Sequence, residues 1–344
     1  MTAATPQARL TRLDGLRGLA ALAVVLFHFT VQFPRFVPGG IAPFTFGPGA
    51  YGVHLFFMIS GFVILMSVAQ RGTAHFARSR FIRLYPVFWA AVLLTSLVLT
   101  LDPLLGPGPG PLQLLANLTM FEQYAHIEPI DGAYWSLTYE LGFYIMMFAL
   151  FASPLHLWIG WLPAWMTLGA AAFPVVGWGI PHPLHLVIGV SEYSHLFAAG
   201  LALYLARTEG FALRHVAVLA AVPLVQGLHD GLTGALVVAG AVMAMIWGTV
   251  PGRQLPRLAT WLTGLGAISY ALYLIHQMIG YVVLARLEAA GLGAWTALLL
   301  ALALVLALAS ALTWGVEKPS ARWLGRVLPR LGDPATSRRD IAES

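Results

Sequence analysis

Two ionisable side chains, His28 and Glu140, lie inside long apolar stretches and are the first candidates for chemistry. A neutral imidazole can accept the proton of a hydroxyl nucleophile, and a carboxylate can orient that imidazole or share its proton. Ionisable groups are costly inside a bilayer and mark functional sites there. We therefore predict a catalytic pair in which His28 is the general base and Glu140 is its partner. A buried pair without a catalytic role explains the same two residues.

The helical rise predicts that these two side chains reach the same depth. At about 1.5 Å per residue, His28 lies roughly 16 Å beyond Arg17, and about three turns put both on one helix face. Glu140 enters from the opposite surface and lies roughly 10 Å below it, close to the about 8–10 Å estimated for His28. We therefore expect the imidazole and the carboxylate to meet.

A pair of arginines near the start of the third apolar stretch is a candidate anion site. Arg80 and Arg83 are spaced i, i+3 and share a helix face. The planar guanidinium fork suits phosphate oxygens. Arginine at a helix end is also an ordinary signal of membrane orientation, so the spacing alone leaves both interpretations open.

The aromatic side chains around Glu140 have two interpretations. Trp135 and Tyr139 could belong to the belt of aromatic residues that is common at membrane interfaces. They could instead form a stacking platform for a sugar at the outer mouth of the protein. The histidines show no spacing typical of metal ligands, so we predict no metal site.

The composition defines where these candidates must be placed. Apolar residues make up 59% of the 344 residues and charged residues 10%, whereas soluble domains have about 45–50% and about 25%. Such a chain can build a lipid-facing exterior but not a water-facing one. The absence of cysteine excludes disulfides and thiolate chemistry.

Apolar stretches long enough to span a bilayer need about 20 residues each. We predict an all-α polytopic membrane protein with about ten transmembrane helices. Their ranges are 13–33, 50–70, 82–101, 133–152, 156–177, 186–206, 213–229, 231–248, 262–285 and 292–316. The boundary between the seventh and the eighth span is the weakest, because only His229, Asp230 and Gly231 interrupt the apolar sequence there.

The distribution of positive charge predicts the orientation of these helices. All of the 19 basic residues except Arg35 and Arg286 fall on one side of the predicted layout. The positive-inside rule makes that side cytoplasmic and places both termini there. We expect a cytoplasmic N-terminal segment at 1–12, a membrane domain at 13–318 and a basic cytoplasmic tail at 319–344. The net charge of +5 therefore reflects orientation in the cell inner (plasma) membrane rather than binding to nucleic acid.

The candidates belong to a longer series of motifs that resembles the acyltransferase 3 family. The motifs are RLDGLRGLAALAVVLFHF with Arg17 and His28, HLFFMISGFVI with Ser60 and Gly61, RSRFIRLYPVFW with Arg80 and Arg83, YWSLTYELGFYI with Trp135, Ser136 and Glu140, ISYALYLIHQ with Ser269, Tyr273 and His276, and VEKP with Glu317. Each motif is weak by itself, whereas six in the same order over about residues 10–325 are specific. Leu141 is a departure, because many members carry a second acidic residue there.

The resemblance implies a membrane enzyme that moves an acyl group, by default acetyl, onto a hydroxyl of a carbohydrate-type acceptor. It implies acyl-CoA as the donor substrate, with phosphates contacting Arg80, Arg83 and Arg17, and no bound cofactor. Supporting or acceptor-contacting positions are Ser60, Trp135, Ser136, Tyr139, Tyr273 and His276. Ser60 would stabilise an oxyanion or pack the helices, and His276 has no assigned role. With a tyrosine directly before Glu140, the chain resembles the branch of the family that O-acetylates polysaccharides. We also expect a stand-alone membrane domain.

Two other classes of protein fit part of the pattern. A proton-coupled transporter or flippase of a glycan or lipid also needs ionisable groups inside the membrane, although no repeated pair of broken helices is visible here. A structural scaffold explains the helices but not the buried ionisable residues. Direct transfer and an acyl-enzyme intermediate on His28 are equally compatible with the motifs.

Overall fold

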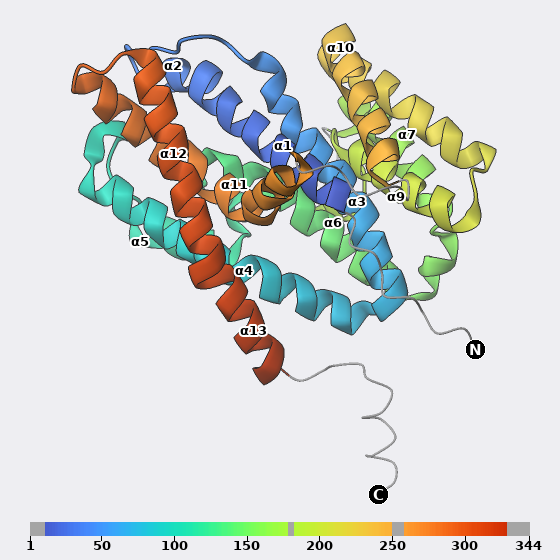
Figure 1. The fold of residues 1–344 in the computed structure, drawn as a ribbon. Helices are drawn as coiled ribbons and strands as arrows, with labels where there is room; N and C mark the ends of the chain where they lie inside the picture. The colour runs from blue at the N-terminus through green and yellow to red at the C-terminus, as the bar shows by residue number, and fades with distance from the viewer. Residues whose placement is uncertain (1–10, 178–181, 250–257, 329–344) are drawn as a thin grey trace, which may run out of the picture.

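The computed structural model describes residues 11–177, 182–249 and 258–328. Its long helices are α1 (Thr11–Phe27), α3 (Gly52–Arg71), α4 (Thr73–Leu101), α6 (Trp135–Phe151), α7 (Leu162–Val176), α9 (Ser194–Glu209), α10 (Leu213–Thr249), α11 (Leu258–Ala289) and α12 (Ala294–Leu312). The short ones are α2 (Phe33–Phe36), α5 (Pro111–Thr119), α8 (His182–Val187) and α13 (Lys318–Val327). No strand occurs in these residues, which confirms the all-α prediction for the described part of the chain (Figure 1).

Within the described residues, six helical stretches are long and apolar enough to cross a membrane. They are Thr11–Phe36, Gly47–Arg71, Thr73–Leu101, Leu213–Thr249, Trp261–Ala289 and Ala294–Val327. Every predicted span overlaps a helix, but the predicted count of ten is not confirmed. The helices α6, α7 and α9 have 17, 15 and 16 residues, short of the about 20 that a bilayer requires. The range predicted as 186–206 is occupied by α9 only from Ser194.

The two spans predicted on either side of residue 230 form one kinked stretch. Helix α10 covers Leu213–Thr249, and Gly231 interrupts it with φ 68° and ψ −164°. Glycine adopts this backbone conformation without the steric penalty of a Cβ atom. Figure 1 shows α10 as two segments at an angle, drawn in yellow to orange.

The core is built around α1, which packs against both α11 and α3. Close approach of the backbones depends on glycine at the crossings. A Cβ atom on Gly266 of α11 would lie 2.0 Å from the carbonyl oxygen of Asp14 in α1. A Cβ on Gly61 of α3 would lie 2.1 Å from the carbonyl oxygen of Phe197 in α9. The helix-packing interpretation of Gly61 therefore has a direct geometric basis.

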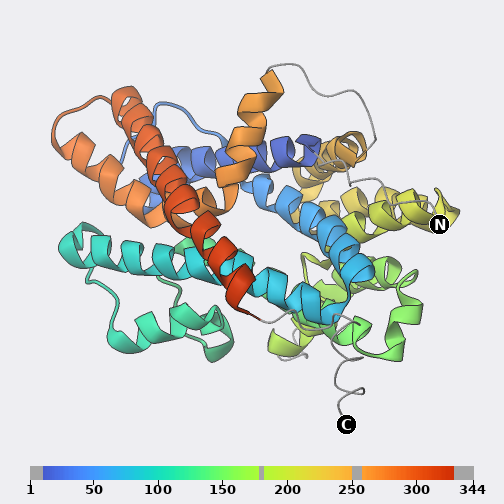
Figure 2. The same cartoon turned by 60° about the horizontal axis from the view of Figure 1, so that its bottom comes forward.

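The last of the described residues continue helix α12. The π-helical turn η8 (Thr313–Glu317) joins α12 to α13, and the three elements form one rod that crosses α4 (Figures 1 and 2). Arg78 of α4 donates to the carbonyl oxygens of Gly325 at 2.7 Å and Leu328 at 3.0 Å. The beginning of the predicted tail at 319–344 is therefore helical and packs against α4.

A second π-helical turn interrupts the first helix where the candidate base lies. The turn η1 spans His28–Gln32, and the N–H of Phe33 donates to the carbonyl oxygen of His28. A π turn inserts an extra residue into the helical spiral and is often found at functional sites. It changes which side chains on the C-terminal part of this span face the core.

Candidate active site

His28 contacts His276 across the interface of α1 and α11. His276 Nε2 lies 3.0 Å from His28 Nδ1, and the ring centroids are 4.8 Å apart. His276 is fully buried and its Nδ1 lies 2.8 Å from the carbonyl oxygen of Tyr273. His28 Nδ1 also lies 3.0 Å from the carbonyl oxygen of Val24.

The partners of the two imidazoles fix their tautomers. A carbonyl oxygen can only accept, so Nδ1 of His276 carries a proton and its Nε2 is an acceptor. His28 Nδ1 must then carry the proton that is shared between His276 and Val24. The lone pair of His28 is therefore on Nε2, which has no protein partner in the described part of the chain. This is the protonation state that a general base requires.

Glu140 of α6 binds hydroxyl groups rather than an imidazole. Its Oε1 accepts from Ser60 Oγ at 2.5 Å and from the hydroxyl of Tyr144 one turn along the same helix. Tyr144 in turn interacts electrostatically with the guanidinium of Arg80, which lines the same cavity. Glu140 therefore belongs to a polar group that connects α3, α4 and α6.

The prediction that the side chains of His28 and Glu140 meet is wrong. No hydrogen bond joins these side chains in the described residues, and they line different cavities. The depth estimate located each residue along its own helix but not around it. His276, which the sequence left without a role, occupies the place expected for the carboxylate.

Three arginines from α1 and α4 converge beside Glu140. Arg17, Arg80 and Arg83 line one cavity together with Ser60 and Tyr144. Arg17 and Arg83 make no ion pair or hydrogen bond within the described residues, and Nε of Arg80 is buried without a partner. The carboxylates of Asp14, Glu140 and Glu317 are near enough to act on this group electrostatically, but none forms an ion pair with Arg17 or Arg83 in the described residues. Guanidinium groups held close together in this way can bind an anion.

Three cavities follow the paths of α1 and α3 and share lining residues. The basic cavity, of about 690 Å³, is lined by Arg17, Arg83, Arg207 and Lys318. The narrower central cavity shares Arg17 and Arg83 with it and extends to Ser136 and Tyr273. The His28 cavity, of about 320 Å³, shares Val53 with the central cavity. The cations therefore lie at one end of a series of cavities and the imidazole at the other.

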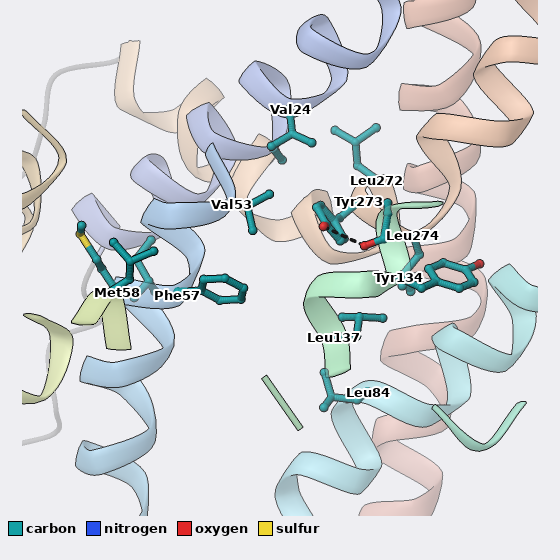
Figure 3. Close-up of a cluster of buried hydrophobic side chains, with 14 of the residues drawn as sticks. Val24, Val53, Phe57, Met58, Leu84, Tyr134, Leu137, Leu272, Tyr273 and Leu274 are labelled. Atoms are coloured by element: carbon teal, nitrogen blue, oxygen red, sulfur yellow. Dashed lines mark hydrogen bonds between the residues drawn. The ribbon is translucent and has the colours of Figure 1, made fainter. Parts of the chain in front are cut away.

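The narrow part of this series is held by hydrogen bonds between α6 and α11. The Tyr273 hydroxyl donates to the carbonyl oxygen of Ala133 at 2.9 Å and lies 2.7 Å from Ser136 Oγ. Figure 3 shows Tyr273 next to Val53 and Val24, with Leu137 below them. Ser136 and Tyr273 are thus brought together as a supporting pair close to His276.

The aromatic residues predicted around Glu140 form a cluster with two residues that precede α9. The ring of Tyr193 lies 5.1 Å from Trp135 and 5.0 Å from Tyr139 between centroids. The hydroxyl of Tyr139 donates to Glu192 Oε1 at 3.0 Å. Trp135 also lines the His28 cavity, whereas Tyr139 faces Glu192 and does not line it.

The loop before α6 is fixed to α11 by a buried carboxyl. Asp131 accepts from the backbone N–H groups of Ala133 at 2.9 Å and Met278 at 3.0 Å. Burial raises the pKa of Asp131 to about 7. This contact positions Gly132 and Trp135 at the edge of the His28 cavity.

Several site residues were not predicted from the sequence. Tyr144 is one turn beyond Glu140, and Gln32 is one turn beyond His28. Gln277 follows His276 directly, and Tyr281 lies one turn after Gln277. Residues four apart are neighbours on a helix. This spacing from His28, Glu140 and Tyr273 points to Gln32, Tyr144 and Gln277, whereas Tyr281 lies four residues from no predicted residue.

The helical architecture, the paired imidazoles and the adjoining cavities are the arrangement expected of a membrane enzyme rather than of a scaffold. A family model described as an acyltransferase domain, of the acyltransferase 3 type, matches residues 10–314. The chain belongs to this family and is an acyltransferase. The resemblance drawn from the six motifs is confirmed.

Two curated proteins resemble the chain. The exopolysaccharide production protein ExoZ of Rhizobium meliloti (strain 1021) is 30% identical over 277 residues, which is 72% of this chain and 81% of that protein. The acyltransferase MdmB of Streptomyces mycarofaciens is 30% identical over 146 residues, 40% of this chain and 38% of that protein. No solved structure gives a significant match.

Proposed function

We propose that this enzyme transfers an acyl group, by default acetyl, from cytosolic acyl-CoA to a hydroxyl of a carbohydrate-type acceptor in the cell inner membrane. The observation that carries the proposal is the hydrogen bond between His276 Nε2 and His28 Nδ1, which leaves His28 Nε2 as a free base facing a cavity. The transporter alternative loses its support, because the chain belongs to a family of acyltransferases.

The basic and central cavities would hold the donor. Arg17 and Arg83 line both cavities, so a pyrophosphate at their junction would contact two guanidinium groups that form no direct ion pair in the described residues. The basic cavity would accept the nucleotide, and the pantetheine arm would extend through the central cavity. His28 is eleven residues beyond Arg17, roughly 16 Å along the helix, and the thioester would lie at the far end of that arm.

The reaction would proceed by general-base catalysis. His28 Nε2 takes the proton of the acceptor hydroxyl while the oxygen of that hydroxyl attacks the thioester carbonyl carbon. The tetrahedral intermediate collapses, the carbon–sulfur bond breaks, and the departing thiolate takes the proton from His28. The products are an ester and CoA, and the imidazole is neutral again. His276 would act as a positioning residue, because it holds His28 in the tautomer with the free Nε2.

Glu140 and Ser60 would act on the donor side. Glu140 accepts from Ser60 and Tyr144, and Tyr144 contacts Arg80. We therefore propose that Glu140 holds the arginine group in position and balances its charge when the donor is absent. This role replaces the one predicted from the sequence, in which Glu140 is the direct partner of His28.

The similarity to a protein named for exopolysaccharide production supports a carbohydrate acceptor. The test supplies radiolabelled acetyl-CoA to membranes with and without this protein and identifies the labelled product. An acetylated carbohydrate that forms only when the protein is present is the expected result. Label in protein or phospholipid alone, with no labelled carbohydrate, contradicts the proposed acceptor class.

A further inference from the structure

The His28 cavity contains polar groups that the catalytic proposal does not use. It is lined by Gln32, Gln277, Tyr281 and Trp135 in addition to His28. Tyr281 is 1% exposed and its hydroxyl has no hydrogen-bond partner. Oε1 of Gln277 is also buried without a partner. Buried polar atoms are usually satisfied. Both side chains line this cavity, so a ligand in the cavity can satisfy these two atoms once the side chains turn toward it.

These groups come from two helix faces that meet at the base. Gln32 ends the π-helical turn η1 that begins at His28, and Tyr281 lies one turn beyond Gln277 on α11. Gln277 is adjacent to His276, so the same turn of α11 positions the Gln277 amide and the imidazole that contacts His28. A Cβ atom on Gly132 would lie 2.6 Å from Gln277 Nε2, so a side chain at this position would displace the amide.

The lining of the His28 cavity has no Arg, Lys, Asp or Glu. The basic cavity, by contrast, has four cationic side chains. An ionised group in the His28 cavity would be desolvated without a counter-charge, which is costly. Amides and phenols both donate and accept, as a ring bearing several hydroxyls requires. The indole of Trp135 offers a flat apolar face beside them.

Resting on the proposed function, we infer that the reacting unit of the acceptor is an uncharged sugar ring. Gln32, Gln277 and Tyr281 hydrogen-bond its hydroxyls, and Trp135 packs against its face. The cavity of about 320 Å³ is at the lower end of the roughly 300–1,000 Å³ typical of ligand sites. It therefore holds one ring at a time, and the rest of the acceptor extends outward past Phe36, which is half exposed.

The test measures acceptor-stimulated CoA release from acetyl-CoA by the purified full-length protein. The probes are octyl β-glucoside, octyl β-glucuronide, which carries a carboxylate, and octyl 2-amino-2-deoxy-β-glucoside, which carries an ammonium group. The neutral glycoside should stimulate release more than either charged one. Gln277→Leu and Tyr281→Phe should each raise the acceptor KM about tenfold, the loss of roughly one hydrogen bond, and leave the acetyl-CoA KM at the wild-type value. Gln113→Leu, on α5 outside the cavity, is the matched control.

Each result of this test has a defined meaning. Equal or greater stimulation by a charged glycoside overturns the inference, as does an acceptor KM that neither variant changes. Stimulation by a cell membrane extract but by no glycoside also overturns it. Failure of the wild-type protein to release CoA with any acceptor, extract included, would count against the acyl-transfer proposal itself.

Discussion

His276 Nε2 lies 3.0 Å from His28 Nδ1, and this contact determines which nitrogen of His28 can act as a base. The proton on His276 Nδ1 is held by the backbone carbonyl of Tyr273, so the orientation of both rings originates in α11. A carboxylate usually orients a catalytic histidine. Here a second neutral imidazole does so in a buried setting, where an ionised carboxylate would need further partners.

His276 is expected to affect turnover rather than donor binding. His276→Ala should lower kcat by about 10–100-fold, as is typical when the residue that orients an imidazole is lost, and leave the acetyl-CoA KM unchanged. His276→Gln should restore part of the rate, because its amide oxygen can still accept from His28 Nδ1. Steady-state CoA release measures both parameters. Equal losses in the Ala and Gln variants would show that His276 only fills space.

Arg17 is expected to recognise the phosphates of the donor. Arg17→Ala should raise the KM for acetyl-CoA by about tenfold or more, the loss of one charge-assisted hydrogen bond. It should not raise the KM for S-acetylpantetheine, which has no phosphate. Arg35→Ala, at an exposed site away from the three cavities, is the control. A similar rise for both donors in the Arg17 variant would place Arg17 outside phosphate recognition.

How much of this site the sequence predicts depends on the kind of contact. The positions of His28, Arg17, Arg80 and Arg83 along their helices follow from apolar length and spacing, and the three arginines do line one cavity. The partner of His28 does not follow, because residues 28 and 276 are joined only by the packing of α1 on α11. Depth below a surface carries no information about direction around a helix.

Two features of the fold could not be predicted from the periodicity of apolar residues, because they leave that periodicity unchanged. The π turn at His28–Gln32 adds one residue to a spiral that looks continuous in the sequence. The helices α6, α7 and α9 are shorter than their apolar stretches, since those stretches continue into turns. The kink at Gly231, by contrast, coincides with the boundary suggested by the neighbouring polar residues.

Gly61 is expected to be intolerant of any side chain. A Cβ atom would lie 2.1 Å from the carbonyl oxygen of Phe197, so Gly61→Ala must separate α3 from α9. Overpacking of this kind typically costs about 1–3 kcal/mol, and we expect a lower melting temperature in detergent. Gly240→Ala is the matched control, because its Cβ would meet nothing within 4 Å. Equal melting temperatures for the two variants would argue against the close crossing.

Glu122 should make stability depend on pH. It is 1% exposed, and burial raises its pKa to about 7 from an ordinary 4.5. Since the folded state binds the proton more tightly, its stability falls as the pH rises from about 4.5 to about 7 and is constant above. Glu122→Gln should therefore melt higher than wild type at about pH 8, on the order of 3 °C. At about pH 4.5 the difference should vanish. A difference independent of pH would show that the buried carboxyl is not the cause.

The most direct test of the account is transfer of label from radiolabelled acetyl-CoA by purified wild-type protein and His28→Ala, with the same membrane extract as the source of acceptor. The wild-type protein should form a labelled ester and release CoA. The variant should be expressed and folded to the same extent, with transfer reduced at least about 10²-fold, the lower end of general-base catalysis. Transfer by His28→Ala at the wild-type rate would contradict the central claim that His28 is the base.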